Sequence, residues 1–315
     1  MAFIRNFNKI NKNDTAIAGG KGASLGEMTQ AGIPVPPGFV ILSNAFDRFL
    51  EETDLNIVID SILHKANHKE MQSIENASEA IKELILEAKM PKDIEHFITA
   101  ECKTLGEKYV AVRSSATAED GKSYAWAGQL ESYLDTTEDK VLEKVKHCWA
   151  SLFTPRAIFY RFENGLHDIK ISVAVVIQKM VESEISGIAF SVHPVTQDRN
   201  QLIIEAGFGL GEAIVSGHIT PDSYVVEKNP RRIIDKNISP QEQGFFRLKN
   251  GGIEWRDVLK EMIDKQKLTD KEILELSELI LKIENHYQFP CDIEWAFEKG
   301  KFYIVQSRPI TTLHN

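Results

Sequence analysis

The glycine-rich motif Gly19-Gly20-Lys21-Gly22 has the residue types of a phosphate-binding segment. Glycines let backbone amides approach an anion closely, and Lys21 adds a compact positive charge that suits a polyphosphate. The motif is not a P-loop, because the lysine of a P-loop is followed by Ser or Thr, whereas Lys21 is followed by Gly22. Taken alone it is a weak signal, and a surface lysine in a flexible turn is the more common interpretation.

A second motif, Val112-Arg113-Ser114-Ser115, ends an apolar stretch that has the pattern of a strand. After it, a run of small residues leads to Trp126-Ala127-Gly128-Gln129 and Ser132. The loops after strand ends are common places for sites, and the guanidinium of Arg113 can bind two phosphate oxygens at once. Backbone amides near Gly128 can approach the same anion. A salt-bridged strand terminus explains Arg113 equally well.

Two further segments could lie near a nucleotide. Gln178-Lys179-Met180-Val181 ends an apolar strand pattern and leads into a connector, and the backbone of such a hinge can hydrogen-bond adenine. By itself this segment is only a strand end. The glycines of 205–213 are spaced Gly-x-Gly-x-Gly rather than Gly-x-Gly-x-x-Gly, so we expect a loop near the nucleotide and no dinucleotide fingerprint.

The last motif has the residue types of a metal site. Asp292 and Glu294 are two residues apart, as are Gln306 and Arg308, and each pair lies in a segment with the pattern of a strand. Side chains two residues apart on a strand share a face. Two carboxylates and a carboxamide oxygen suit Mg²⁺, and Arg308 beside them would hold a polyphosphate. Charges facing inward from apolar strands are costly unless paired, which favours this interpretation over a structural salt bridge.

The intervening pattern predicts the elements that position these residues. A glycine-rich turn runs into a short helix over 17–31, and residues 56–105 form an outer helical layer with breaks near Asn76 and Met90–Pro91. A central strand covers 170–181, and a second sheet begins near residue 182. We expect strands also from 108 and over 129–135, a long helix within 268–287, and a final hairpin turning at Lys299–Gly300. Residues 138–162 have helical spacing that Pro155 kinks or restarts, with core residues Val141, Val145, Cys148, Trp149 and Leu152.

Composition limits the classes of function. At 315 residues and 43% hydrophobic, the chain can form two lobes with sizeable cores. The formal net charge of −9 excludes a broad basic surface for nucleic acid or anionic lipid. The three scattered cysteines fit a reducing cytoplasm rather than disulfides or zinc, and no apolar stretch is long enough to span a membrane.

The motifs together resemble the family of phosphoenolpyruvate synthase (pyruvate, water dikinase), pyruvate phosphate dikinase and rifampin phosphotransferase, and most of all the phosphoenolpyruvate synthases. The resemblance covers essentially the whole chain. It rests on the order of the motifs, since no single one is strong. They are GGKGASLGEM, GIPVPPGFV, VRSSATAED, WAGQLESYL, SGIAFSVHPVT, IIEAGFGLGEAIVSGHITPDSY, DIEWAF and FYIVQSRPIT.

The resemblance implies an α+β, ATP-grasp fold with the nucleotide between two lobes. The first lobe would cover 1–181, with a helical insert at about 54–105, and the second 182–315. It also implies a role for each candidate residue. Lys21, Arg113 and Arg308 would bind phosphates, Gly128 and Ser132 would lie in a phosphate-covering segment, Gln178 and the Met180 backbone would hold adenine, Glu205 would approach the ribose, and Glu294, Gln306 and the neighbouring Asp292 would hold Mg²⁺.

In that family, the ATP-binding domain transfers a phosphoryl group to a histidine on a swivelling domain, which carries it to an acceptor domain. None of the nine histidines here has the expected Thr-x-x-His-Ala setting. His193, in SVHPVT, is the only one we consider as an internal acceptor, and a structural turn is its simpler interpretation. We therefore expect the swivel and acceptor domains on another chain or in a longer enzyme, with pyruvate as the default acceptor.

Other functions stay open at this stage. The chain could be a nucleotide-binding regulatory or scaffold subunit without transfer, although intact candidate residues argue against that. It could be the donor module of a rifampin phosphotransferase or phenylphosphate synthase. An ATP-grasp ligase acting alone would release ADP rather than AMP.

Overall fold

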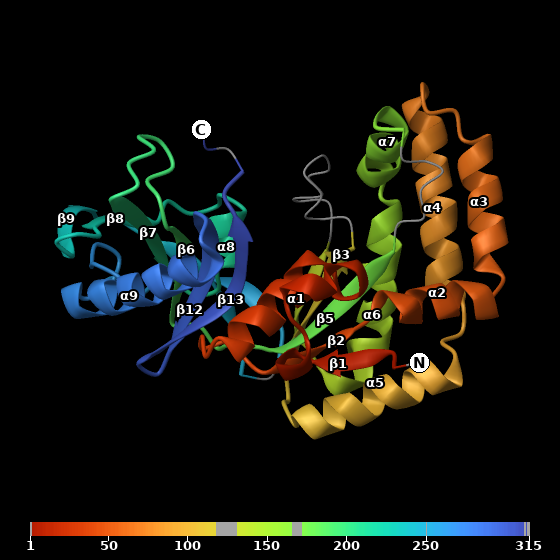
Figure 1. Cartoon of the computed structure of the whole chain (residues 1–315), viewed down its shortest axis with the longest axis horizontal. Helices are drawn as coiled ribbons and strands as arrows, with labels where there is room; N and C mark the ends of the chain where they lie inside the picture. The colour runs from red at the N-terminus through yellow and green to blue at the C-terminus, as the bar shows by residue number, and fades with distance from the viewer. Residues whose placement is uncertain (1, 118–130, 166–171, 250, 312, 314–315) are drawn as a thin grey trace. The chain divides into compact units, whose positions relative to one another are not determined.

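The computed structural model describes residues 2–117, 131–165, 172–249, 251–311 and 313 (Figure 1). The chain divides into two compact units, the first made of Met1–Glu27 and Pro37–Met180, the second of Met28–Pro36 and Val181–Asn315. Each unit combines helices with an antiparallel sheet, which confirms the α+β part of the predicted fold class.

The sheet of the first unit has five strands in the order β1-β2-β5-β3-β4, and every neighbouring pair is antiparallel. The β-branched run predicted as a central strand forms β5, which occupies the middle of the sheet because its side chains are apolar on both faces. The strands are β1 (Ile4–Asn6), β2 (Gly38–Ile41), β3 (Val110–Ala116), β4 (Ser132–Thr136) and β5 (Val173–Lys179).

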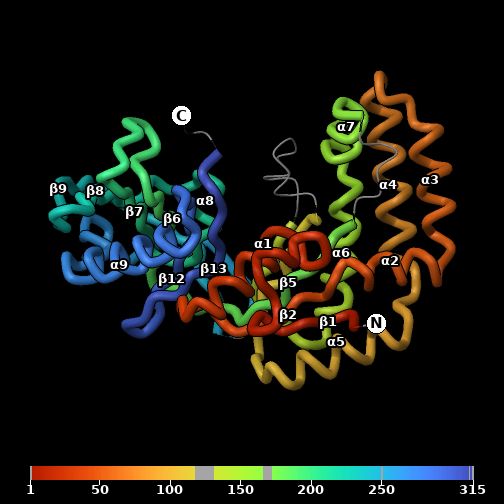
Figure 2. The backbone as a smooth tube through the Cα atoms, in the orientation of Figure 1, coloured from red at the N-terminus to blue at the C-terminus, as the bar shows by residue number. Residues whose placement is uncertain are grey.

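Helices cover one face of this sheet and form the core of the first unit with it. Val112, Val175 and Ile177 pack with the helical layer, and the stripe predicted over the 138–162 segment is buried. Figure 2 shows α3, α4, α6 and α7 as neighbouring rods. The helices are α2 (Ser43–Glu52), α3 (Leu55–Lys65), α4 (Met71–Glu87), α5 (Lys92–Leu105), α6 (Val141–Ala150) and α7 (Pro155–Glu163), with 3-10 turns η1 (Phe7–Lys9), η2 (Lys12–Asp14), η3 (Glu138–Lys140) and η4 (Ser151–Phe153).

The predicted glycine-rich turn is a kink inside a longer helix, α1 (Thr15–Gln30). Gly19 has non-helical angles, φ 68° and ψ 170°, and divides α1 into two helical parts. Residues just after the kink contact the face of the sheet opposite to the helical layer, since a Cβ on Gly22 would lie 3.1 Å from Val40.

The second unit contains a six-stranded antiparallel sheet in the order β13-β12-β6-β7-β8-β9. Helix α9 (Asp270–Tyr287) runs across one face of it (Figure 1), and its buried side chains pack on the apolar alternate positions of β7, β8 and β12. The strands are β6 (Ile185–Phe190), β7 (Gln201–Phe208), β8 (Asp222–Glu227), β9 (Arg232–Asn237), β12 (Cys291–Glu298) and β13 (Lys301–Pro309). A separate hairpin, β10 (Gln243–Arg247) with β11 (Ile253–Asp257), and the short helix α8 (Glu212–Val215) complete the unit.

Backbone and side-chain bonds attach the segment Met28–Pro36 to the second unit. The Ile304 amide donates to the Pro34 carbonyl at 2.9 Å, and Lys282 Nζ donates to the Gly32 carbonyl at 3.0 Å. A piece of chain close to the amino terminus therefore packs with elements near the carboxy terminus.

The final hairpin has the predicted turn and one irregularity. Lys299 and Gly300 have φ of 50° and 77°, the positive values that a tight two-residue hairpin turn needs. Strand β13 contains a bulge, because Glu294 lies opposite Gln306 while Trp295 lies opposite Ile304. Val305 is the extra residue.

A buried ion pair lies in the second unit. Lys267 Nζ is 2.8 Å from Asp222 Oδ1, and both side chains are 0% exposed. The carboxylate also accepts from the backbone amides of Ser239 and Lys267 and from the Tyr224 hydroxyl, at 3.0, 2.9 and 2.7 Å. Lys267 Nζ donates to the Ser239 carbonyl as well, so the charges of both partners are compensated within the core.

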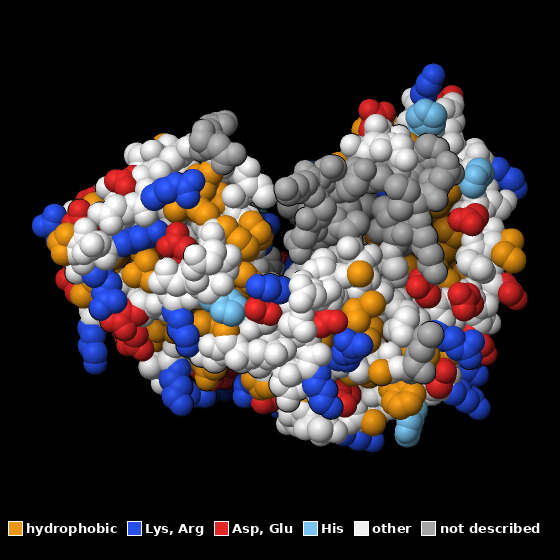
Figure 3. Space-filling model, viewed as in Figure 1, with side chains coloured by type: hydrophobic (Ala, Val, Ile, Leu, Met, Phe, Trp, Pro, Cys, Tyr) orange, Lys and Arg blue, Asp and Glu red, His pale blue; other side chains and the backbone are white. Residues whose placement is uncertain are grey.

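The surface carries both signs of charge. On the face shown in Figure 3, basic side chains are interspersed with acidic ones over the described residues. Among the helices that the structure describes, none has the length and apolar character required to cross a bilayer.

Candidate functional site

The glycine-rich segment lies directly on strand β3. The Ser115 hydroxyl accepts a hydrogen bond from the Gly22 amide at 3.2 Å and donates to the Ala18 carbonyl at 3.0 Å. A Cβ on Gly19 would lie 2.2 Å from Ser115 Oγ and 2.3 Å from its carbonyl oxygen, so no side chain fits there. The first two sequence motifs, separated by more than 90 residues, are therefore adjacent.

Lys21 follows the kink and is half-buried. Its charge lowers the pKa of the Cys148 thiol, against larger raising effects of burial and of the Glu131 carboxylate. Lys21 and Glu131 thus lie within electrostatic range of the same thiol, near the end of β3 where Ser114 bonds the Glu131 carbonyl at 2.9 Å.

Arg113 and Ser132 are opposite each other in the β3–β4 ladder. Arg113 is 8% exposed and, by the alternation of the strand, shares a face with Ser115 and hence with the glycine-rich segment. Gly128, predicted to contribute to a phosphate-covering segment with Ser132, lies outside the described residues.

The predicted adenine hinge lies at the end of β5. Gln178 is buried and pairs with Ala111, which places it on the same face of the sheet as Arg113. The Met180 amide donates to the Tyr109 carbonyl at 3.1 Å. A donor contact from Met180 to adenine would have to replace this bond.

The remaining candidates share one face of the sheet in the second unit. Gln306 pairs with Glu294, Glu294 with Ile188, and Ile188 with Glu205, so their side chains form a row across four strands. This face is opposite to the one that α9 covers, since the alternate positions Ile293 and Ile204 are buried in the core.

One step along the hairpin, Asp292 pairs with Arg308. The carboxylate Oδ2 accepts from Arg308 Nε and Nη2, both at 2.8 Å. The Arg308 side chain is 50% exposed and that of Asp292 14%. The period-2 prediction for both pairs therefore agrees with the register of the hairpin.

Burial and mutual repulsion raise the pKa values of two of these acids. For Asp292 burial raises the pKa most, Arg308 lowers it, and Glu294 raises it. For Glu205 burial again has the largest effect, and the Asp292 charge adds to it. The carboxylates of Glu205, Asp292 and Glu294 therefore lie on one face together with the Arg308 guanidinium, an arrangement that suits a bound cation.

The donor set fits magnesium. Within the ranges that the structure describes, no group of three or more His, Cys, Asp or Glu side chains converges on one point. A metal at the predicted position thus depends on the Gln306 carboxamide as well as on Glu294 and Asp292. All three supply oxygen, the ligand atom that Mg²⁺ prefers.

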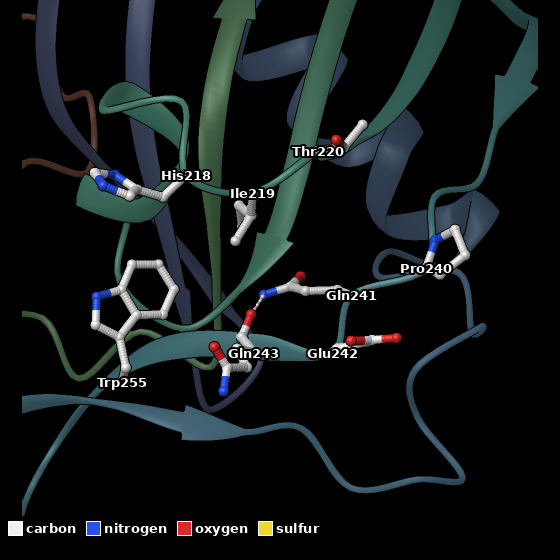
Figure 4. Close-up of a pocket in the computed structure, with 8 residues that line it drawn as sticks. All are labelled: His218, Ile219, Thr220, Pro240, Gln241, Glu242, Gln243 and Trp255. Carbon is white, nitrogen blue, oxygen red and sulfur yellow. Dashed lines mark hydrogen bonds between the residues drawn. The ribbon is translucent and has the colours of Figure 1, made fainter.

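A pocket of about 470 Å³ lies elsewhere in the second unit (Figure 4). No candidate residue from the sequence lines it, and the Gln241 amide on its floor is already hydrogen-bonded to Phe208 and Gln243. At its edge, the ring centroids of the His218 imidazole and the Trp255 indole are 5.7 Å apart. The lining residues are His218, Ile219, Thr220, Pro240, Gln241, Glu242, Gln243 and Trp255.

His193 has a structural role in its turn. Its Nδ1 accepts from the Val195 and Thr196 amides, each at 3.3 Å, and the backbone of the same residue bonds Gln197 and Asp198. These contacts explain the residue without a role as phosphoryl acceptor.

Comparison with known proteins identifies the family. The model of the pyruvate phosphate dikinase AMP/ATP-binding domain matches residues 15–315. The chain belongs to this family. It is 45% identical, over 99% of its length, to a probable phosphoenolpyruvate synthase of Methanocaldococcus jannaschii, and 47% identical, over 96%, to one of Archaeoglobus fulgidus. It is 39% identical, over 99%, to the rifampicin phosphotransferase of Bacillus subtilis. The chain spans 27%, 41% and 36% of these relatives, so it corresponds to a minor part of each.

Ser115 belongs to one of the sequence motifs, but the motif alone indicates no role for it. Its hydroxyl bonds residues 18 and 22 of the glycine-rich segment. The local pattern of apolar and polar residues cannot predict a bond between residues so far apart in the sequence. Ser115 follows two equally polar residues, Arg113 and Ser114, at the end of the strand, so the sequence does not distinguish it from its neighbours.

Proposed function

We propose that this chain binds MgATP and donates a phosphoryl group to a histidine on a separate swivelling domain or subunit, with AMP and phosphate as products. The observation that supports this most is the packing of the glycine-rich segment on β3, which brings the backbone on both sides of Lys21 to the face of the sheet that carries Arg113. Membership of an AMP/ATP-binding domain family agrees with it.

In this proposal the fold is an ATP-grasp, with lobes at 1–181 and 182–315 that both contribute to one nucleotide site. Its support is that each unit has an antiparallel sheet covered by helices on one face, with the candidate polar residues on the other. Such a face offers fixed charges next to a solvent-excluded core.

The first unit would hold the nucleotide itself. Lys21 and Arg113 neutralise charge on the phosphates, Ser132 and Gly128 cover them, and Gln178 with the Met180 backbone orients adenine. Catalysis of this kind depends on positioning and electrostatics more than on covalent chemistry by the protein.

The second unit would hold the metal and the terminal phosphates. Glu294, Gln306 and Asp292 supply oxygen ligands, and Glu205 approaches the ribose. A bound Mg²⁺ would supply charge neutralisation at the phosphate oxygens. Arg308 uses two of its nitrogens on Asp292 and is half exposed, so its guanidinium is held in one orientation while a face stays accessible to phosphate.

Pyruvate is the proposed final acceptor, because the archaeal relatives are named phosphoenolpyruvate synthases. The Bacillus subtilis relative gives a second candidate, an antibiotic acceptor. In either case another domain would recognise the acceptor. We place the reaction in the reducing cytoplasm, since Cys102, Cys148 and Cys291 are free buried thiols.

Isotope transfer tests the proposal. The chain is incubated with MgATP labelled at the β-phosphate and with the phosphohistidine domain of a related phosphoenolpyruvate synthase, supplied as a separate polypeptide. We expect label on that histidine and release of AMP, with loss of both in Glu294→Ala and no change in Lys301→Ala, an exposed residue of the same hairpin.

Other outcomes would identify other functions. Release of ADP without labelling of histidine would indicate a ligase. Binding of MgATP without turnover, with every partner domain tested, would indicate a regulatory or scaffold subunit.

A further inference from the structure

We propose that Ser115, on strand β3, is a positioning residue that holds Lys21 in its phosphate-binding position. Its hydroxyl does so by capping the second part of helix α1. This inference rests on the proposed function of Lys21 as a phosphate ligand.

The kink in α1 creates a helix start that its own sequence cannot cap. Helix N-cap residues commonly accept a hydrogen bond from an amide two or three positions later through a side-chain oxygen. The N-cap position here is Gly19, which has no side chain. Ser115 Oγ takes that place, since it accepts from the Gly22 amide three residues after Gly19.

The close contact between Gly19 and Ser115 leaves no room for a capping side chain at position 19 itself. A side chain on Gly19 would collide with Ser115 Oγ and with the Ser115 backbone, at 2.2 to 2.6 Å. The positive φ of 68° at Gly19 also disfavours every residue with a Cβ. A glycine at 19 and a hydroxyl at 115 are therefore two parts of one arrangement.

The hydroxyl connects both sides of the kink. It donates to the Ala18 carbonyl and accepts from the Gly22 amide, so the backbone is fixed immediately before and after the stretch that carries Lys21. Ser115 itself is 0% exposed and is the next-to-last residue of β3, all of whose residues are buried. Without the hydroxyl, the buried Gly22 amide and the buried Ala18 carbonyl each lose their bond to β3, and the backbone on both sides of Lys21 loses that attachment.

The expected effect is specific to phosphate. Lys21 would contact the triphosphate, whereas the adenine contacts are proposed for Gln178 and Met180 at the end of β5. Loss of the hydroxyl should therefore weaken binding of the triphosphate part and leave that of the nucleoside unchanged.

Titration calorimetry with this chain tests the inference. Ser115→Ala should bind the magnesium complexes of a non-hydrolysable ATP analogue and of tripolyphosphate about 10-fold more weakly than wild type, with adenosine binding unchanged. Ser78→Ala is the matched control, because Ser78 is also buried and its hydroxyl makes a long-range bond to the Phe153 carbonyl at 2.7 Å in the same unit. The control should bind all three as wild type does.

A double-mutant cycle separates positioning from general destabilisation. In a Lys21→Ala background, Ser115→Ala should weaken the binding of the analogue by less than about 2-fold, because the group that it positions is absent. A full 10-fold effect in that background would overturn the inference, as would an equal loss of adenosine binding or no loss at all. If Ser115→Ala does not fold, Ser115→Cys, which keeps a weak donor and acceptor, takes its place with the same expected order.

The result also separates the two proposals. Binding by wild type with unchanged binding by Ser115→Ala would refute the role of Ser115 and leave the proposed function intact. No binding of the ATP analogue by wild type would refute the proposed function itself, and the inference with it.

Discussion

Removing one partner of the buried Asp222–Lys267 pair should destabilise the second unit strongly. Lys267→Met keeps a side chain of similar length and removes the charge, which leaves the Asp222 carboxylate in the core. Breaking a buried ion pair on one side costs about 3 to 5 kcal/mol, because the other charge loses its compensation.

The hydrogen bonds that each remaining partner keeps decide how large the loss of unfolding free energy should be for each single variant. In Lys267→Met, Asp222 keeps the Ser239 and Lys267 amides and the Tyr224 hydroxyl as donors, so we expect a loss near 3 kcal/mol. In Asp222→Ala, the partners that remain for the Lys267 ammonium among the described residues are the Ser239 carbonyl and the Phe208 ring, 5.4 Å away. The loss should then approach 5 kcal/mol.

Urea denaturation followed by tryptophan fluorescence measures both losses, since Trp295 is buried in the same unit. The control is Lys236→Met, which removes an exposed ion pair with Asp270 and should cost no more than about 1 kcal/mol. If Lys267→Met lost less unfolding free energy than about 1 kcal/mol, or if Lys267→Met and Asp222→Ala lost equal amounts, this account of the pair would be refuted.

Three further predictions concern the glycine kink, the thiols and the acidic face. Gly19→Ala should lower the unfolding temperature and weaken tripolyphosphate binding, as a titration would show, because its Cβ collides with Ser115. Burial raises the pKa of Cys102 to about 11 and that of Cys291 to about 12, so a disulfide reagent at pH 8 should label them only as the chain unfolds. Burial, together with the Asp292 charge, raises the pKa of Glu205. At pH values between the unfolded and the folded pKa, the folded chain holds a proton on Glu205 that the unfolded chain has lost, so the stability of the wild type falls as pH rises through the folded pKa. Glutamine has no such proton, so Glu205→Gln should raise the unfolding temperature more at pH 8 than at pH 5.

Each of these has a specific contrary result. Gly165→Ala, at an exposed glycine with a positive φ and nothing within 4 Å, controls for backbone strain, and an equal effect on tripolyphosphate binding would contradict the steric argument. Labelling of native thiols within minutes would contradict their burial. A stabilisation by Glu205→Gln that is independent of pH would show that the charge is not its cause.

Local signals in the sequence predicted many elements correctly. Pro155 begins α7 after the Thr154 cap, and the break at Met90–Pro91 separates α4 from α5, because proline cannot continue a helix from its interior. The predicted break near Asn76 is wrong. Asn76 accepts a bond from the Gln72 side chain one turn earlier at 3.1 Å, which supports the helix, and the break lies before it, where the Asn67 side chain caps a turn at Lys69.

Contacts between distant residues were beyond sequence reasoning. The alternation of β12 and β13 predicted which candidate side chains share a face, since a strand has a fixed period. The Ser115 contact and the Asp222–Lys267 pair join residues 93 and 45 positions apart. They depend on how sheets and loops pack, which residue spacing does not encode.

The bulge at Val305 lets one strand contribute to two environments. On a regular strand, Ile304 and Gln306 would point the same way. With one extra residue, Ile304 pairs with Trp295 inside the core, while Gln306 pairs with Glu294 on the polar face. Deleting Val305 would force the hairpin either to move Ile304 out of the apolar core or to move Gln306 into it. The folding of this unit and its capacity to bind a metal would then compete for the same side chains.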